Sequence, residues 1–394
     1  MSFVRLGDFL EVQSGFAFKT EHFTSGDGMP LIRIRDLARS KTEINYSGTY
    51  RPDFVVNSGD YLIGMDGNFR CHRWQGGESL LNQRVCRIRH FQEDIEPDYV
   101  YYGIQRKLQD IEDTTSFMTV KHLSAKQVQN IKMPLPSLPE QRRIVDLLSR
   151  AEGIVRLRRE AEKKAAELIP ALFNDMFGDP ATNPKGWPIE KLDGLLSSID
   201  SGHSPVCHAR KRLNQEWCVL KLSALTGSAY RESEHKVLPK EVAPDQTVEV
   251  RRGDLLISRK NTADLVGTAA YVWHTQGKAL LPDLIFRLNV ADSNRLNSLY
   301  LWGLLTLPVK RVQIKALASG SAGSMPNISK SRLKTLDIEV PPLDRQIAYA
   351  QALEQIVSIQ SQQTSATAKA QATFDALLAR CFVPTAAVEG RSSD

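Results

Sequence analysis

The sequence PSLPEQRRIVDL at residues 136–147 recurs in the same chain as PPLDRQIAYAQA at residues 341–352, which is 205 residues later. The stretches before them repeat at the same offset, because HLSAKQVQNIKM at residues 122–133 matches NISKSRLKTLDI at residues 327–338. Two long matches at one offset predict that the chain is a tandem duplication.

The repeat extends in both directions from this stretch. Downstream, ALFNDMF at residues 171–177 matches ALLARCF at residues 376–382, again 205 residues apart. Upstream, Gly59–Ile63 matches Gly253–Ile257 at an offset of 194, and the shrinking offset indicates loops of different length. The repeated unit is about 200 residues long, with its variable part first and its constant part last.

Each copy begins with short segments of apolar and β-branched residues separated by Gly, Pro, Asp and Asn. In the first copy they lie at Pro30–Leu37, Gly59–Gly64 and Leu80–Arg89, and they predict short strands of a compact α+β domain. A stretch almost free of proline follows and predicts a helix of about 39 residues, roughly 58 Å long. Pro139 suits the first turn of this helix, and Pro170 is expected to kink it near its end.

A heptad pattern along both long stretches predicts a coiled-coil seam. In the first copy the two core positions run through Ile144, Ala151, Arg158, Ala165 and Leu172, and through Leu147, Ile154, Ala161, Leu168 and Asp175. The residues predicted to lie between the helices or against a partner are Ile144, Leu147, Ala151, Ile154, Arg158, Leu168, Leu172, Ile356, Ile359, Gln363 and Leu377.

Pairing of the two copies about a pseudo-twofold axis sets the two long helices antiparallel. Arg158 and Gln363, the polar core residues, are then expected to face each other at the centre. The alternative, in which both are solvated positions on irregular helices, stays open. The predicted fold is α+β, with two globular domains joined by two long antiparallel coiled-coil helices in an internal tandem repeat with pseudo-twofold symmetry.

Length and composition exclude several classes of protein. With 394 residues, 42% hydrophobic and 24% charged, the chain is long enough for two domains and is neither wholly disordered nor collagen-like. Its start lacks the pattern of a signal peptide, and no apolar run approaches the length of a membrane span. The five cysteines are scattered without a C-x-x-C pair. We therefore expect a reduced cytoplasmic protein with no metal site and no cofactor.

Two motifs carry a resemblance to a known family. PxLPEQRRIVxxL at residues 136–148 and FxxMFGDPxxNPKGWP at residues 173–188 resemble motifs of the DNA specificity subunit of type I restriction–modification systems. The order of domains and helices is similar over most of residues 4–382. One departure is that Asp344-Arg345-Gln346 stands in the second copy where Pro139-Glu140-Gln141 stands in the first. A contact made by Glu140 therefore cannot be assumed for Arg345.

The resemblance implies a non-catalytic subunit that binds double-stranded DNA through two target recognition domains, each reading one half of a bipartite, asymmetric target. It also implies that the helices act as a spacer and as a platform for two DNA methyltransferase subunits, which methylate adenine, and that restriction (motor-nuclease) subunits join the complex. The expected segments are a first recognition domain at 1–137, a first helix at 138–178, a linker at 179–188, a second recognition domain at 189–342, a second helix at 343–382 and a disordered tail at 383–394.

The alternatives are a stand-alone nuclease and a scaffold protein unrelated to restriction. The sequence lacks the Asn/Asp-Pro-Pro-aromatic element and the Gly-rich cofactor loop of an amino-methyltransferase. A nuclease that uses Mg²⁺ needs clustered carboxylates together with a lysine. Glu162–Lys164 and Glu234–Lys236 have part of this spacing, but neither has a Pro-Asp pair a short distance upstream. The sequence therefore disfavours nuclease chemistry.

Candidate DNA-contacting residues are basic, amide, hydroxyl or aromatic side chains near the predicted loops, because such groups read base edges and bind phosphates. In the first domain they are Lys19, Arg33, Arg35, Asn68, Arg70, His72, Arg73, Trp74, Gln83 and Arg84. In the second domain they are His208, Arg210, Lys211, Arg212, Lys221, Arg259, Lys260, Asn261, Ser324, Asn327 and Lys330. For each residue the alternative is a solvated surface position, and Arg33 and Arg35 have acidic residues as alternative partners.

The net charge of +6 is distributed unevenly. Residues 1–137 carry 17 basic and 17 acidic side chains, whereas residues 181–336 carry 22 basic and 13 acidic ones. We therefore expect the second domain to contribute more of the phosphate-driven, salt-sensitive affinity for DNA.

Overall fold

The computed structural model describes residues 3–114, 122–213, 215–320 and 325–382. Contacts between Cα atoms divide the chain into two compact units. The first unit comprises Met1–Arg159 and Ser365–Asp394, and the second comprises Glu160–Thr364. Each unit therefore combines a globular domain with pieces of both long helices.

The first unit is built on a four-stranded antiparallel sheet and a five-stranded mixed sheet of short strands. The four-stranded sheet has the order β2 (Glu11–Ser14), β10 (Val85–Arg89), β7 (Tyr61–Gly64), β8 (Cys71–Arg73). The mixed sheet has the order β3 (Phe23–Thr24), β5 (Asn45–Tyr46), β4 (Met29–Ile32), β9 (Ser79–Leu81), β6 (Val55–Val56). The remaining elements are the pair β1 (Phe3–Arg5) and β11 (Lys132–Pro134), and the helices α1 (Ile34–Leu37), α2 (Pro97–Thr114) and α3 (Ala125–Gln129).

The second unit repeats this order of elements with different loops. Its four-stranded sheet has the order β13 (Leu196–Ser201), β19 (Ile285–Val290), β16 (Leu255–Ser258), β17 (Ala269–Tyr271). Its three-stranded sheet has the order β15 (His235–Val237), β14 (Cys218–Leu220), β18 (Ala279–Leu280). The remaining elements are the pair β12 (Ile189–Lys191) and β20 (Asp337–Glu339), and the helices α6 (Ser298–Thr306), α7 (Pro308–Ala316) and α8 (Lys330–Lys334).

Each four-stranded sheet has a largely buried arginine on an inner strand, Arg87 on β10 and Arg287 on β19. These two residues show that the repeat extends to side-chain contacts. In the first unit the guanidinium of Arg87 donates to the side chain of Gln13 and to the carbonyl of Val55. In the second unit Arg287 donates to the side chain of Asp200 and to the carbonyl of Glu249. Each arginine joins the adjacent strand of its sheet to a backbone carbonyl outside that sheet, in β6 for Arg87 and in a loop for Arg287, so the same kind of contact stabilises the same part of both domains.

The long helices are α4 (Leu138–Ala166), α5 (Leu168–Phe177) and α9 (Leu343–Phe382). The break between α4 and α5 falls at Glu167, three residues before Pro170. The predicted kink near Pro170 is therefore confirmed, because the proline ring removes a donor and crowds the preceding turn. Pro139 is the second residue of α4, where no helical hydrogen bond requires its missing N–H.

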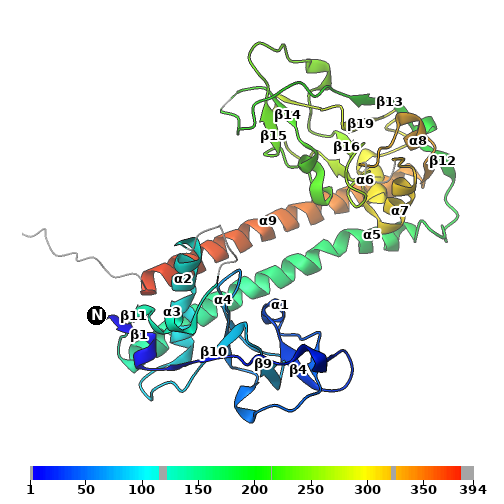
Figure 1. Cartoon of the computed structure of the whole chain (residues 1–394). Helices are drawn as coiled ribbons and strands as arrows, with labels where there is room; N and C mark the ends of the chain where they lie inside the picture. Colours follow the sequence, from blue (N-terminus) through cyan, green and yellow to red (C-terminus); the bar gives the residue numbers. More distant parts are fainter. Residues whose placement is uncertain (1–2, 115–121, 214, 321–324, 383–394) are drawn as a thin grey trace, which may run out of the picture. The chain divides into compact units, whose positions relative to one another are not determined.

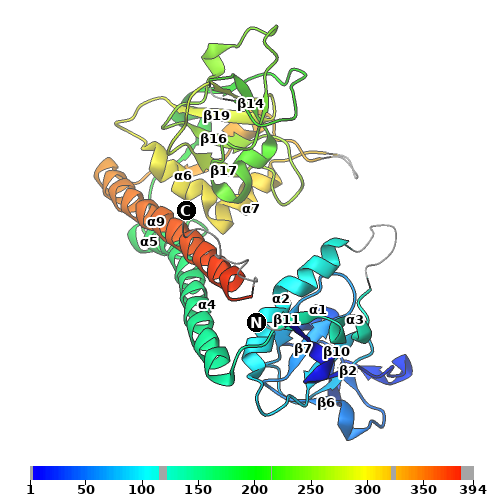
Figure 2. The ribbon, with the colours of Figure 1, turned by 90° about the vertical axis from the view of Figure 1, so that its left-hand side faces the viewer.

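Within each unit the long helices pack side by side in opposite directions (Figures 1 and 2). In the first unit, Arg159 Nη2 donates to Gln371 Oε1 over 2.7 Å, and the earlier residue Ile144 shares a core with the later residue Phe382. In the second unit, Gln360 Nε2 donates to the carbonyl of Ala165 over 2.7 Å. The Phe173 ring in that unit lies 5.5 Å from the Tyr349 ring. In both units residue numbers rise along one helix as they fall along the other, so the pairing is antiparallel.

The buried face of α4 differs from the predicted heptad. Ile144, Leu148 and Val155 are buried, whereas Leu147 and Ile154 are 37% and 51% exposed. Ile144 and Leu148 join the core that also contains residues of α2, because α4 packs on its own domain as well as on α9. The buried face is therefore rotated toward the domain, and one of the two predicted core positions is left on the surface.

The predicted polar layer also differs in register. Gln363 lines a cavity of about 210 Å³ together with Glu162 and Ala165. Glu162 lies one turn beyond Arg158 along α4. Gln363 therefore faces the turn after the one that contains Arg158, its predicted partner. Residues near the ends of the long helices belong to the domain cores, so the pairing of the helices also depends on packing that the arithmetic of the sequence does not include.

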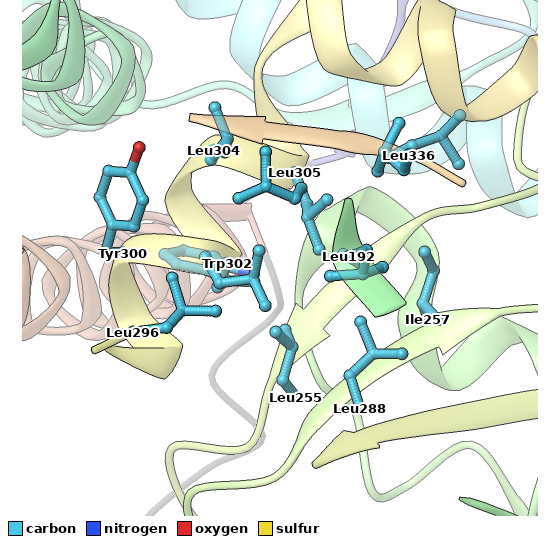
Figure 3. Packing of buried hydrophobic residues seen from close by; sticks show 14 of the residues in the cluster. Leu192, Leu255, Ile257, Leu288, Leu296, Tyr300, Trp302, Leu304, Leu305 and Leu336 are labelled. Atoms are coloured by element: carbon cyan, nitrogen blue, oxygen red, sulfur yellow. The ribbon is translucent and has the colours of Figure 1, made fainter. Parts of the chain in front are cut away.

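The core of the second unit is formed by the sheet, α6 and the ends of two long helices. Figure 3 shows the part of this core where α6 packs against the sheet. Leu255 and Leu288 of the sheet face Trp302 and Leu305 of α6. The buried aromatic residues of the long helices that join this core are Phe173, Phe177 and Tyr349. The contact between α5 and α9 is therefore continuous with the hydrophobic core of the second domain.

Two further features of the described residues bear on function. All five cysteines are free thiols. Among the helices that the structure describes, none combines the length and the apolar character that a membrane span needs.

Candidate nucleic-acid interface

One end of each four-stranded sheet brings together loops that are far apart in the sequence. In the first unit a Cβ atom on Gly15, directly after β2, would lie 2.0 Å from the carbonyl oxygen of Asn82. In the second unit a Cβ atom on Gly202, directly after β13, would lie 1.8 Å from the carbonyl oxygen of Leu281. Only glycine permits this close approach. The same close crossing of backbones therefore organises the same sheet end in both domains.

In the first domain this end carries an acidic residue between two basic groups. His122 Nδ1 lies 2.7 Å from Asp66 Oδ1, and Arg84 Nη1 lies 3.4 Å from Asp66 Oδ2. More than half of each of the Arg84 and His122 side chains is exposed. The predicted residues Asn68 and Gln83 are exposed on the same two loops. This group offers amide and cationic donors and one carboxylate acceptor to a ligand.

In the second domain the same sheet end is basic. Arg259 Nε donates to Asn327 Oδ1 over 3.0 Å, and Lys260 is bridged to Asn327 through the backbone. The Arg259 guanidinium and the Lys330 ammonium lie 5.5 and 5.6 Å from the centre of the Phe286 ring. The structure thus brings together four predicted residues: Arg259, Lys260, Asn327 and Lys330. Cations spaced in this way suit phosphate oxygens and the acceptors on guanine.

Several candidates of the first domain have partners within the protein. Arg33 contacts Asp36 and Glu43, and Arg70 donates to Gln109 of α2. Arg73 is bonded to Asp98 and lies over the ring of Tyr101. The Trp74 indole is buried and donates to the carbonyl of Gly77.

The other candidates of the first domain are less constrained. Lys19 is largely exposed and lies 3.6 Å from Glu21, and Arg35 is exposed on α1. His72 is half-buried in β8. Burial and the nearby charge of Arg70 lower the pKa of His72, so its imidazole is held in the neutral form. As a neutral ring, His72 is a poor phosphate ligand.

In the basic segment 208–212 of the second domain, two of the arginine side chains are bonded to other residues of the protein. Both Nη atoms of Arg210 lie 2.7 Å from the carboxylate of Glu216, and this bond lowers the pKa of Glu216 to about 2. Arg212 donates to Glu232 and to the carbonyl of Gly277. His208 and Lys211 are exposed in the same segment.

The remaining second-domain candidates differ in exposure. Lys221 is half-exposed directly after β14. Asn261 is buried, with its side-chain oxygen accepting from the N–H of Thr262. Ser324 lies outside the described residues. Asn261 is therefore placed to shape the Arg259–Lys260 loop rather than to reach a ligand.

Sequence reasoning missed Asp66 and His122 at this sheet end. The repeat itself contains the signal for His122, because the stretch that begins at His122 matches the stretch that begins at Asn327. The two positions form the equivalent backbone bridges, Asp66 with His122 and Lys260 with Asn327. Asp66 has no such signal, since an isolated acid in a loop is usually a solvated residue.

The clusters considered for nuclease chemistry are not assembled into a metal site. His235 is buried, and its Nε2 accepts from the backbone N–H of Arg212. Across residues 3–114, 122–213, 215–320 and 325–382, no three His, Cys, Asp or Glu side chains are grouped so that they could hold a metal ion.

The long helices carry a second exposed feature, an apolar stripe on α4. Leu147, Ile154 and Leu157 are 37%, 51% and 58% exposed, and Leu147 and Ile154 lie about two turns apart on one helix face. Leu168 of α5 and Ile359 of α9 are also about half exposed. We call Leu147, Ile154 and Leu157 the α4 stripe.

The other predicted helix residues are less exposed. Ile144 is buried, and intermediate exposure is seen for Ala151, Arg158, Leu172, Ile356, Gln363 and Leu377. These residues lie on or near the faces that pack within each unit.

Comparison with known proteins identifies relatives of both halves. A family model described as "Type I restriction modification DNA specificity domain" matches residues 1–167 and again residues 185–370. The specificity subunit of the type I restriction enzyme EcoBI from Escherichia coli is 38% identical over 163 residues, 41% of this chain and 34% of that protein. The EcoEI specificity subunit, also from Escherichia coli, is 30% identical over 230 residues, 58% of this chain and 38% of that protein. The matched part thus spans about a third of the length of these curated relatives.

Solved structures agree on the fold. The S subunit of a type I restriction–modification system from M. genitalium superimposes with a TM-score of 0.61 at 12% identity, covering 97% of this chain and 96% of that chain. A chain from a structure of the type I R-M system, solved to explain complex assembly and conformational transition, superimposes with a TM-score of 0.53 at 22% identity. It covers 96% of both chains.

Proposed function

The chain belongs to the type I restriction–modification DNA specificity family, and we propose that it reads a bipartite, asymmetric double-stranded DNA target with one half-site per domain. In this proposal the first recognition domain comprises residues 1–137 and the second comprises residues 189–342. The two long helices at 138–178 and 343–382, with the linker at 179–188 between the copies, set the distance between them. Catalysis is assigned to other subunits, and the chain needs no cofactor of its own.

The observation that carries the proposal is the equivalence of the two sheet ends. Both are organised by a glycine that lets two backbones touch, and both carry polar side chains on the same loops. Their chemistry differs, because Asp66 and His122 in one domain stand where Lys260 and Asn327 stand in the other. Equivalent frameworks with different exposed groups are what two readers of two different half-sites require.

The α4 stripe supports a second part of the proposal, that the helices bind DNA methyltransferase subunits. Apolar residues exposed at a spacing of seven suit a partner helix, which buries such a stripe at regular intervals. We propose two methyltransferase subunits, one for each copy of the repeat, which methylate adenine at the target. Restriction (motor-nuclease) subunits would join this complex, in line with the solved type I R-M assembly that has a similar chain.

The direct test is to express the full chain with its methyltransferase subunits in a host without adenine methylation, and to sequence the methylated sites. The expected result is one split motif with a fixed gap. Lys260→Ala is expected to relax one half of the motif and Arg84→Ala the other, by about 1 to 3 kcal/mol for each hydrogen-bonded base pair that is no longer read.

A matched control is Arg70→Ala, which removes an exposed arginine of the first domain that is already bonded to Gln109. Both half-sites should survive this change. A single variant that alters both halves of the motif would contradict the two-reader proposal. Cleavage of DNA by the purified chain alone would favour the nuclease alternative instead.

A further inference from the structure

Gln141, in the first turn of α4, uses its whole amide to join the helix to the domain. Its Nε2 donates to the carbonyl oxygens of Asp94 and Pro136, each over 3.0 Å. Its Oε1 accepts from the backbone N–H of Glu96 over 2.9 Å. The side chain is 1% exposed. Removal of the amide would therefore take the hydrogen-bond partners away from two carbonyl groups and one N–H group inside the protein.

Gln346, in the first turn of α9, makes the equivalent three bonds in the second unit. Its Nε2 donates to the carbonyl oxygens of Arg295 and Pro341 over 3.1 and 2.7 Å. Its Oε1 accepts from the backbone N–H of Asn297 over 2.8 Å. This side chain is completely buried.

The two glutamines connect the same two structural elements. Glu96 and Asn297 immediately precede α2 and α6, the domain helices, whereas Pro136 and Pro341 lie in the turns that lead into the long helices. Each glutamine thus ties the start of a domain helix to the start of a long helix.

Of the three residues 139–141 and their counterparts 344–346, only the glutamine is kept; the preceding Leu138 and Leu343 also match. Pro139 and Glu140 of the first copy are replaced by Asp344 and Arg345 in the second, while Gln141 and Gln346 coincide. The geometry requires an amide, because two carbonyl oxygens need donors and one N–H needs an acceptor. A glutamate would place a carboxylate against two carbonyl oxygens.

We propose that Gln141 and Gln346 are positioning residues that fix each recognition domain on its helix and thereby set the gap between the two half-sites. The proposal rests on the function proposed above. A half-site presents the same groove face once per 34–36 Å, or about 10 base pairs, so a shift of only about 3.5 Å moves a reader by one base pair. A loosened junction at the start of either long helix therefore changes the permitted gap without touching the reading loops.

The test measures methylation by the full complex on DNA with fixed half-sites and gaps one or two base pairs shorter and longer than the native gap. The quantity compared is the ratio of methylation at a neighbouring gap to methylation at the native gap. In Gln141→Ala and Gln346→Ala this ratio is expected to rise about tenfold over that of the unaltered complex. This factor corresponds to roughly the free energy of one buried hydrogen bond. The half-site sequences should stay unchanged.

The matched control is Gln13→Ala, another buried glutamine of the first domain, whose amide bonds to Asp53 and Arg87 away from the long helices. It is expected to lower stability while leaving gap preference intact. Gln141→Met keeps the volume without the hydrogen bonds and serves if the alanine variant does not fold.

The outcomes separate the inference from the proposed function. If the glutamine variants lose activity in equal proportion at every gap, the residues are only structural and the inference is overturned. If the unaltered complex methylates half-sites regardless of the gap, the bipartite function itself is overturned. A relaxed gap in the glutamine variants, with the native gap kept in Gln13→Ala, supports the inference.

Discussion

Lys310 of α7 and Glu339 of β20 form an ion pair inside the second unit, with Nζ 2.9 Å from Oε1. The lysine is completely buried, and its ammonium also donates to the carbonyl of Asp337 over 2.6 Å. Because β20 leads into α9, this pair anchors the strand from which the second long helix begins. Removal of one partner would leave the other charge buried without compensation.

Lys310→Met is therefore expected to destabilise the second unit by about 3 to 5 kcal/mol. Urea unfolding of the full chain, followed by circular dichroism, measures the change. Lys315→Met is the matched control, because Lys315 lies 3.8 Å from the exposed Asp264 and such surface pairs contribute at most about 1 kcal/mol. Equal destabilisation in the two variants would show that the buried pair contributes no more to the free energy of unfolding than the surface pair does.

The pKa of His72 predicts a decrease of stability in mild acid. Burial and the charge of Arg70 lower this pKa in the folded protein below its ordinary value of 6.5. The unfolded chain then binds a proton on His72 more readily than the folded chain, so the stability contribution is present above pH 6.5 and falls as the pH drops below it. His72→Gln is expected to reduce this decrease, measured as the urea midpoint at pH 7.5 and at pH 5.5.

A second variant tests the cause of the shift. Arg70→Gln removes the neighbouring positive charge and is expected to raise the pKa of His72 toward its ordinary value. The imidazole signals of His72 in an NMR titration report this directly. An unchanged titration in Arg70→Gln would leave burial as the sole cause.

The repeat made much of the fold predictable from the sequence. Two matching copies of about 200 residues fixed the order of domain, helix, domain and helix, and Pro170 marked the break before α5. The heptad failed to identify the buried face of α4, since periodicity cannot tell which neighbour a helix packs on. Leu147 and Leu148 are both leucines, and only Leu148 is buried, in a core that also contains residues of α2.

The candidate site was predictable only in part, because residue type does not reveal internal partners. Arg73 and Arg259 look equally suited to DNA in the sequence, but Arg73 is ion-paired with Asp98 of α2, whereas Arg259 lies with Lys260 and Asn327 at the sheet end. Asp98, the partner of Arg73, is 25 residues away in the sequence. Long-range pairing of this kind leaves no local pattern.

The α4 stripe predicts a requirement for apolar contact with a methyltransferase subunit. Leu147→Glu and Ile154→Glu place charges on this face and are expected to weaken partner binding by at least about 2 kcal/mol, or roughly 30-fold. Co-purification and calorimetric titration with the methyltransferase subunit measure the effect. The fold should be unaffected, because both side chains are already exposed.

The control for the stripe is Val312→Glu, since Val312 of α7 is 68% exposed and belongs to the second unit. Binding should be unchanged in this variant. If Val312→Glu weakens binding as much as Ile154→Glu does, the effect comes from net charge and the stripe is not the contact.

The uneven charge predicts that the basic sheet end of the second domain controls the salt dependence of DNA binding. Lys260→Ala and Lys330→Ala are each expected to reduce the slope of log affinity against log salt by about 0.9 for each phosphate that the variant no longer neutralises. Fluorescence anisotropy of the full complex with duplex DNA, between low and physiological salt, gives the slopes. Lys191→Ala is the control, because that ammonium is already paired with Asp337 at 2.6 Å and its removal should leave the slope unchanged. The first domain has no excess of basic residues, so Arg35→Ala should lower the slope by less than Lys260→Ala does. A larger effect of Arg35→Ala would contradict the prediction that the second domain makes most of the phosphate contacts.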